Sequence, residues 1–322
     1  MLMNNSLKEI AETIKNANRI VMYPHVNMDG DALGSCVALG YGLRALGIDC
    51  SILISEDIPD NLKFLDDDFC TKDLAVAVGS DISLLIDSGE LKRIPEREDA
   101  FLSGKMTICL DHHGTTDPFC HMNYIDSYAA ATGQIVFKLI QELGVTGTKK
   151  MGEALFAAIT TDTGDFQYSN TQKESHQIVA ELYDWGIDHN RVSVEIYESN
   201  RLERLKMTSR VMSEMEVFAD GKAAIACVSQ AILRETGAKM EETEWIAGDL
   251  RSIKGVEVAA FLKEEQENVI KCSLRSKHSL DVASLAAKFG GGGHIRASGY
   301  TDYCSLDEAK SRIIQAITEA LS

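Results

Sequence analysis

The sequence predicts an α/β fold: a mostly parallel sheet with helices on both faces, followed by a smaller α/β C-terminal domain with a mixed sheet. Two observations support this. Short apolar runs alternate with helical patterns in the first half, and the pattern changes near residue 190. The 322 residues suit two domains, and an apolar fraction of 45% with 25% charged residues is typical of a globular protein.

The first half of the chain alternates predicted strands and helices. Apolar segments predict strands at 19–24, 49–55, 82–87 and 106–111. Helical patterns cover residues 6–17, 31–47, 131–143, 150–160 and 173–185. This alternation is typical of a parallel sheet buried on both faces. We therefore expect residues 1–190 to form one domain.

The second half begins with a charged, glycine-free stretch, which we interpret as a connecting helix over 191–215. A second domain then covers residues 216–322. Its predicted strands are at 222–229, 255–264 and 269–276, and its predicted helices are at 281–288 and 306–320. Four consecutive glycines at 290–293 form the one biased run.

Charge and cysteine usage exclude several classes of protein. With 32 basic against 49 acidic residues, the net charge of −17 disfavours binding to long duplex nucleic acid. The eight cysteines are scattered without a Cys-x-x-Cys pair, which indicates reduced thiols. The amino terminus lacks the apolar core of a signal peptide, and no apolar run reaches the ~18 residues of a membrane helix. We expect a cytoplasmic protein.

Acids and imidazoles follow the predicted strands where each one ends. They come after the strands at 19–24, 82–87 and 106–111, and one more acid lies where the helix at 150–160 ends. Ligands of parallel sheets collect at the carboxyl ends of the strands, so we expect these side chains to converge. They are His25, Asp29, Asp31, Asp87, Asp111, His112, His113 and Asp162.

Each of these residues also has a simpler interpretation. Asp29 or Asp31 suits the N-cap of the following helix, and Asp87 suits a turn. The joint pattern favours a metal site, because carboxylates about 4 Å apart repel by about 4 kcal/mol at an effective dielectric near 20. Divalent cations relieve that repulsion, and mixed oxygen and imidazole ligands suit manganese, magnesium or iron(II). A pair of such ions activates water at neutral pH.

These motifs resemble those of a known family. The sequence "DHH" at 111–113, with "HVNMDGDALGS", "IDSG" and "TDTG" in the same order, resembles the DHH phosphoesterases. The tail, with its Gly-Gly-Gly-His sequence, resembles the DHH-associated C-terminal domain. The resemblance covers essentially the whole chain. It is greatest to the nanoRNases that also act as pAp phosphatases.

The resemblance implies a role for each matching residue. His25, Asp29 and Asp87 would hold one manganese ion. Asp31, Asp87, His112 and Asp162 would hold a second, which makes Asp87 the bridging acid. Asp111 would orient a neighbouring side chain, while His113 would face the phosphate or the leaving oxygen.

The glycine run has two interpretations, a flexible linker or a loop whose N–H groups approach a phosphate. The resemblance favours the second, with the C-terminal domain holding the far end of a short substrate. The substrate-binding residues it implies are Arg275, Ser276, Gly291, Gly292, Gly293, His294 and Arg296. Two features differ from the family pattern. Asp165 adds an acid after "TDTG", and Ala131 leaves Thr132 as the nearby hydroxyl.

The resemblance implies a manganese-dependent hydrolase that cuts very short oligoribonucleotides to mononucleotides and removes the 3′-phosphate of pAp. An alternative is a phosphodiesterase for cyclic or linear dinucleotides such as c-di-AMP, pApA and pGpG. A RecJ-type exonuclease would require further nucleic-acid-binding domains, and a family pyrophosphatase would lack the Gly-Gly-Gly-His sequence. A nucleotide sensor would not need every metal-binding acid. Homodimerisation is compatible with the resemblance.

Overall fold

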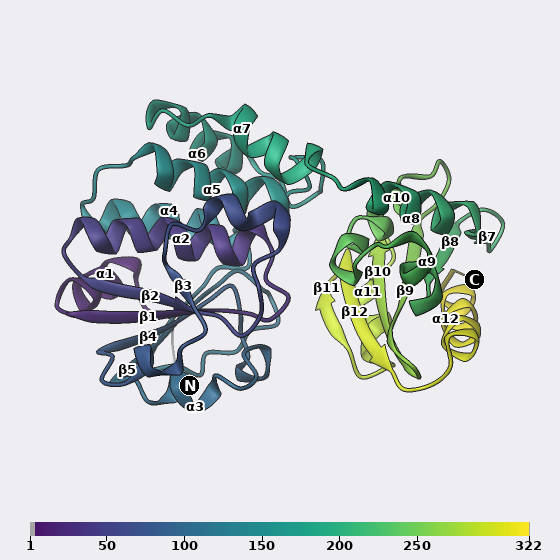
Figure 1. The fold of residues 1–322 in the computed structure, drawn as a ribbon, viewed down its shortest axis with the longest axis horizontal. Coiled ribbons are helices and arrows are strands. Elements are labelled where there is room, and N and C mark those ends of the chain that lie inside the picture. Colours follow the sequence, from purple (N-terminus) through teal and green to yellow (C-terminus); the bar gives the residue numbers. More distant parts are fainter. Residues whose placement is uncertain (1–3, 322) are drawn as a thin grey trace. The chain divides into compact units, whose positions relative to one another are not determined.

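The computed structural model describes residues 4–321, and the chain divides into an N-terminal and a C-terminal unit between Ser199 and Asn200 (Figure 1). The N-terminal unit contains a six-stranded parallel sheet, and the C-terminal unit contains a six-stranded mixed sheet. The predicted α/β class is therefore confirmed.

The N-terminal sheet has the strand order β3-β2-β1-β4-β5-β6. Its strands are β1 (Arg19–Pro24), β2 (Asp49–Leu53), β3 (Cys70–Thr71), β4 (Ile82–Ile86), β5 (Met106–Asp111) and β6 (Met122–Ile125). The chain changes its direction of travel across the sheet between β1 and β4, and ligands of such sheets bind outside the carboxyl ends at this switch point. The short edge strands β3 and β6 were not predicted.

Both faces of this sheet are covered, as the apolar strands predict. In β1, Ile20 and Met22 enter the core beneath the long helices, whereas Val21 and Tyr23 enter a second core with Phe101. The first face carries α1 (Leu7–Lys15), α2 (Gly30–Ala45) and α4 (Thr132–Leu143), and the opposite face carries α3 (Glu98–Leu102). Short 3-10 helices complete the connections at η1 (Asp60–Leu65), η2 (Leu74–Ala77) and η3 (Leu91–Arg93).

A further layer of helices lies above α2 and α4 (Figure 1). It consists of α5 (Lys149–Asp162), α6 (Lys173–Asp184) and α7 (His189–Ser193). The backbones of α2 and α5 approach closely because Gly34 has no side chain. A Cβ added at Gly34 would lie 2.4 Å from the carbonyl oxygen of Ala154. A Cβ added at Gly42 on the same helix would lie 3.7 Å from Ile140, an ordinary contact.

The outer edge of β6 pairs with the residues that precede α1. The side-chain amide of Asn4 donates to the carbonyl of Ile125 at 2.8 Å and accepts from its N–H at 2.7 Å. Asn5 donates its backbone N–H to the carbonyl of Asn123 at 2.7 Å and accepts from the Asn123 N–H at 3.0 Å. These four bonds satisfy backbone groups that an edge strand otherwise leaves open.

The stretch 191–215, expected as one connecting helix, is divided among several elements. The end of α7 continues into a π-helical turn, η4 (Val194–Glu198), and the next helix, α8 (Leu202–Ser213), starts after three non-helical residues. Helix α8 belongs to the C-terminal unit.

The C-terminal unit has the strand order β11-β12-β10-β9-β8-β7, in which β8 and β9 are parallel and the other pairs antiparallel. Its strands are β7 (Glu216–Phe218), β8 (Ala223–Val228), β9 (Val258–Gln266), β10 (Val269–Ser276), β11 (Gly292–His294) and β12 (Ala297–Asp302). One face carries α8, α9 (Gln230–Thr236) and α10 (Ile246–Ser252), and the other carries α11 (Val282–Ala287) and α12 (Leu306–Leu321). A short 3-10 helix, η5 (Met240–Thr243), precedes α10.

Across residues 4–321, no helix has both the length and the apolar character needed to span a membrane.

The packing of α2 on α5 generates a first prediction. We expect Gly34→Ala to lower the free energy of unfolding by about 1–3 kcal/mol, because the added methyl group overlaps the Ala154 carbonyl. Gly42→Ala is the matched control on the same helix, and we expect it to be neutral or to stabilise by up to about 1 kcal/mol. Urea denaturation of both variants measures the difference, and equal stabilities would contradict the close approach.

Candidate metal centre

Three neighbouring strands deliver polar side chains to one edge of the N-terminal sheet. His25 follows β1, Asp87 follows β4, and Asp111 ends β5 directly before His112 and His113. Two helix ends add the remaining acids of the predicted set. Asp29 and Asp31 stand at the start of α2, and Asp162 is the last residue of α5.

The structure brings all eight predicted side chains together. Ligand atoms lie within 4.8 Å of one another in each of three groups, which are His25 with Asp29 and Asp87, Asp31 with Asp87 and His112, and Asp87 with Asp111 and His113. Asp162 joins them through its Oδ2, which lies 3.4 Å from Nε2 of His112. Asp87 is common to the three groups and only 2% exposed.

The two imidazoles nearest to Asp87 are oriented by backbone carbonyls. Nδ1 of His25 lies 2.7 Å from the carbonyl oxygen of Val26, and Nδ1 of His112 lies 3.2 Å from that of Ala129. Because a carbonyl only accepts hydrogen bonds, each Nδ1 carries the proton. Each Nε2 then faces the carboxylates, and both lie 3.5 Å from Asp87. This is the usual arrangement of a histidine that binds metal.

Asp29 is the N-cap of α2, and its geometry is also compatible with the metal-site interpretation. Its Oδ1 accepts hydrogen bonds from the N–H groups of Asp31 and Ala32, each at 3.0 Å, and so caps α2. Its Oδ2 lies 3.8 Å from Nε2 of His25. One carboxylate therefore begins the helix and faces the candidate metal position.

The first turn of α4 holds the carboxylate of Asp31, a contact that the sequence analysis missed. Helix α4 has Ala131 at its N-cap, which offers no side-chain acceptor. The N–H groups of Thr132 and Gly133 donate instead to Asp31, at 2.6 and 2.8 Å. The Thr132 hydroxyl donates to Asp87 at 2.8 Å. The signal in the sequence was the uncapped "ATG" before an apolar helix, since free N–H groups at a helix start attract anions.

The pKa values of Asp31 and Asp87 are shifted in opposite directions by their surroundings. Burial raises the pKa of Asp31 well above its usual value, and the charges of Asp87, Asp162 and Asp29 raise it further. Burial would also raise the pKa of Asp87, but the hydrogen bond from His25 and the charges of His113 and His112 hold it below the usual range. Crowded, buried carboxylates beside imidazole nitrogens are a donor set that fits a divalent cation.

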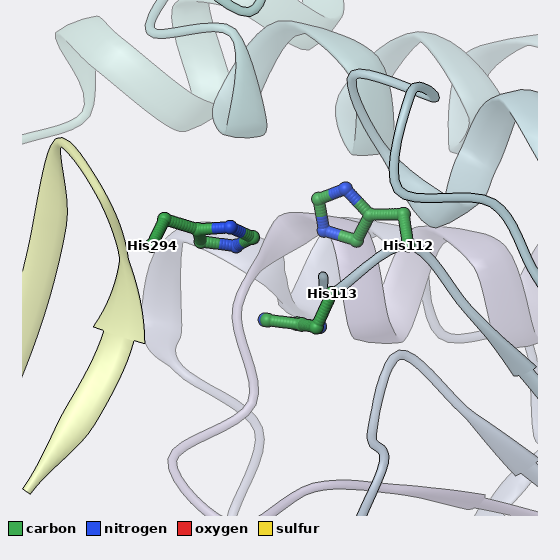
Figure 2. A group of neighbouring side chains, drawn as sticks. All are labelled: His112, His113 and His294. Carbon is green, nitrogen blue, oxygen red and sulfur yellow. The ribbon is translucent and has the colours of Figure 1, made fainter. Parts of the chain in front are cut away.

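His113 is held by the carboxylate of Asp111. Its Nδ1 lies 2.7 Å from Oδ1 of Asp111, and the Thr116 hydroxyl donates to the other oxygen of the same carboxylate. Burial lowers the pKa of His113, but the hydrogen bond to Asp111 and the charge of Asp87 outweigh burial and raise it to about 9. The rings of His112 and His113 lie 4.7 Å apart and are inclined at 62° (Figure 2).

The predicted substrate-binding residues gather at one end of the β10–β12–β11 sheet in the C-terminal unit. Arg275 on β10 and His294 on β11 (Figure 2) both pair with Ala297, on opposite sides of β12. Ser276 is buried, and its hydroxyl lies 3.4 Å from the carbonyl of Ile295. The guanidinium of Arg296 donates to the carbonyl of Leu280 at 3.1 Å. These two side chains therefore also support the loop around them.

Close packing explains two of the glycines beside these residues. A Cβ at Gly291 would lie 2.2 Å from the carbonyl oxygen of Gly299. Gly293 has φ +136°, and a Cβ there would lie 2.7 Å from the carbonyl oxygen of Ala297. Gly292 has open space instead and lies in β11 beside them. The glycine run thus enters a strand and is not a free linker.

The fold and the cluster of acids and imidazoles define a metal-dependent phosphoesterase, and the chain belongs to the DHH family. The model for the DHH family, N-terminal domain, matches residues 19–159, and the model for the DHHA1 domain matches residues 220–322. The family expected from the sequence motifs is confirmed.

Several relatives match over nearly the whole chain. The bifunctional oligoribonuclease and PAP phosphatase NrnA of Thermus thermophilus is 31% identical, over 98% of this chain and 94% of the relative. The protein of the same name from Bacillus subtilis is 27% identical, over 94% of each. The crystal structure of an exopolyphosphatase-related protein from Bacteroides fragilis has a TM-score of 0.89 at 28% identity, over 98% of this chain and 96% of that one.

Asp162 generates a prediction about the metal-free protein. Burial raises its pKa to about 6; the charges of His112 and His113 oppose this shift, and those of Asp29 and Asp87 add to it. Because the folded value exceeds the unfolded one, the stability that Asp162 contributes is present below about pH 4 and is lost as the pH rises through 6. We expect Asp162→Asn in a chelator to be more stable than the wild type at pH 7.5, by about 1–2 kcal/mol.

Thermal denaturation at several pH values tests this expectation. The difference between Asp162→Asn and the wild type should shrink towards pH 4.5. Added divalent metal should reverse the order, because it stabilises the wild type more. A difference that stays constant between pH 4.5 and 7.5 would show that the Asp162 carboxylate is not destabilised by its neighbours.

Proposed function

We propose that this chain is a manganese-dependent hydrolase that degrades very short oligoribonucleotides to mononucleotides and converts pAp to AMP. The observation that carries the proposal is that Asp87 belongs both to the candidate group with His25 and Asp29 and to the candidate group with Asp31 and His112. Likeness over nearly the full length to relatives named for both activities supports the choice of substrates. The net charge of −17 favours a small phosphorylated substrate over a long nucleic acid.

The two groups suggest how a metal pair would be held. His25, Asp29 and Asp87 would bind one ion, and Asp31, Asp87, His112 and Asp162 the other. This assignment is supported by the distances within the groups and by the outward Nε2 atoms of both histidines. Asp87 would bridge the ions, and its two oxygens already face different histidines, Oδ2 towards His25 and Oδ1 towards His112.

A bound metal pair supplies an activated water and neutralises charge on the phosphate. The protein contributes the positions of the ligands. Thr132 directs Oδ1 of Asp87, and the start of α4 fixes both oxygens of Asp31. Little of this framework needs to move during the reaction, because the imidazoles are also held by backbone carbonyls.

His113 and Asp111 are proposed to serve the leaving group. Asp111 is fully buried and holds Nδ1 of His113, so Nε2 is the ring nitrogen proposed to face the substrate. A protonated Nε2 donates to a phosphate oxygen or to the departing alkoxide. The bond to Asp111 favours that protonated state.

The C-terminal unit is proposed to bind phosphate groups of the substrate. Arg275 and His294 flank the same residue of β12, and Gly292 leaves the backbone of β11 open to a ligand. Arginine forms paired hydrogen bonds with phosphate oxygens, which suits this role. Ser276 and Arg296 are proposed to shape the loop, in line with their contacts to Ile295 and Leu280.

Asp87→Asn tests the metal pair. Asp87 has φ +58°, a conformation that asparagine also adopts, so the backbone should be preserved. We expect manganese-dependent hydrolysis of a short RNA to fall by about 10³-fold, because the metal pair supplies several kcal/mol of transition-state stabilisation.

The matched control is Asp165→Asn. Asp165 has a similar φ of +54°, and its carboxylate accepts a hydrogen bond from the Thr160 hydroxyl at 3.1 Å. It belongs to none of the metal groups found among the described residues. We expect the activity of this variant to stay within a few fold of the wild type, because substitutions of exposed residues usually have small effects. Equal activities of the two variants would refute a metal role for Asp87.

A substrate panel tests the proposed specificity. RNAs of two to five nucleotides, pAp, pGpG, pApA and c-di-AMP are compared with manganese and then with magnesium. We expect release of mononucleotides from the short RNAs and of phosphate from pAp. Preferential cleavage of c-di-AMP or pApA would assign the chain to dinucleotide turnover, and absence of any product would refute the enzymatic proposal.

A further inference from the structure

A buried arginine lies beneath the loop that carries the first metal-binding residues. Arg97 precedes α3, in the connection between β4 and β5, and is only 2% exposed. Its Nη1 donates to the carbonyl of Leu53 at 2.7 Å and to that of Pro24 at 3.1 Å. Its Nε has no hydrogen-bond partner among the described residues.

Placing a guanidinium there costs free energy. Burial lowers the pKa of Arg97, and the nearby charge of Glu56 opposes this only in part. Both of its hydrogen bonds are to backbone carbonyls, so it is not held by a bidentate carboxylate. An apolar side chain would fill the same volume at lower cost. The function of the charged side chain is therefore to donate hydrogen bonds to these two carbonyls.

Those carbonyls lie where β1 and β2 stop pairing. The last paired residues of the two strands are Met22 and Ile52. Leu53 directly follows Ile52, Pro24 lies two residues beyond Met22, and Pro24 is the residue before His25. The guanidinium thus links β1 and β2 beyond the last residues that pair between them.

The same connection holds the next residue of the loop. The N–H of Val26 donates to the carbonyl of Arg93 at 2.8 Å. On the other side, the N–H of Asn27 donates to Glu56 at 2.9 Å and Asn27 adopts φ +52°. Pro24, Val26 and Asn27, which surround His25 in the sequence, are therefore fixed by groups outside the candidate metal ligands.

We propose that Arg97 is a positioning residue, which holds His25 and Asp29 in the geometry that binds metal by joining the ends of β1 and β2. This inference rests on the metal pair proposed above. Among the described residues, the hydrogen bonds of the Arg97 side chain are to the carbonyls of Pro24 and Leu53 and not to the candidate ligands. Arg97 acts only on the group of His25 and Asp29. The other group is held by different elements: Asp31 by the start of α4, His112 by the carbonyl of Ala129, and Asp162 by its place at the end of α5.

The test measures manganese binding to the full chain after metal removal. Isothermal titration should find two manganese ions on the wild type. In Arg97→Met, which removes the donors but keeps the stem, we expect one ion to bind about 10- to 100-fold more weakly, as for other residues that orient metal ligands. The other ion should keep its affinity. The paramagnetic resonance spectrum should change from that of a coupled pair to that of a single manganese.

Arg97→Lys distinguishes hydrogen bonding from packing. The lysine ammonium can donate to both carbonyls, so we expect it to restore most of the lost affinity. Should Arg97→Met fail to fold, Arg97→Gln takes its place. The glutamine nitrogen ends where Nε lies, and so it does not reach either carbonyl.

A destabilised control excludes a general effect. Ile14→Ala removes a fully buried side chain from α1 and should lower the melting temperature while leaving both manganese affinities unchanged. Two wild-type affinities in Arg97→Met or Arg97→Gln would overturn the role of Arg97 and leave the metal pair intact. Equal weakening in the lysine variant would overturn it as well. A wild type that binds fewer than two ions would overturn the proposed metal pair and this inference together.

Discussion

Repulsion among buried carboxylates at the carboxyl edge of the N-terminal sheet is the constraint on which the rest of that unit depends. Asp31 and Asp87 are almost inaccessible to water, so the protein must supply the hydrogen bonds that water would otherwise donate to these carboxylates. It does so with the first N–H groups of α4, the hydroxyl of Thr132 and the imidazole of His25. The strand order and the start of α2 and α4 all bring these compensating groups to the same place.

The residues at this edge could be predicted from the sequence because the pattern that places them there is local. A buried parallel strand is an apolar run, and the first polar residues after the run must lie at its carboxyl end. That reasoning located His25, Asp87 and Asp111 without knowledge of the strand order. Asp29 shows that competing interpretations of one residue need not exclude each other, since its two oxygens take different partners.

What the sequence did not predict depends on contacts between distant segments. The bond from Thr132 to Asp31 spans 101 positions, and that from Arg97 to Pro24 spans 73. Neither has a local pattern, because the donor needs only to reach a point set by other elements. The two-residue β3 is too short to show a period. At β11, Gly291 and Gly293 are required by close packing against Gly299 and Ala297, but in the sequence they resemble glycines of a flexible linker.

The pairing of Asn4 and Asn5 with β6 has a consequence for handling the protein. Two asparagines imitate a seventh strand and close the side of the sheet that faces solvent. A recombinant form that lacks the residues up to Asn5 would leave backbone amide and carbonyl groups of β6 unpaired. Such an edge can pair with a strand of another molecule and promote aggregation. Affinity tags are therefore better separated from this segment by a spacer, so that Asn4 and Asn5 can still pair with the edge of β6.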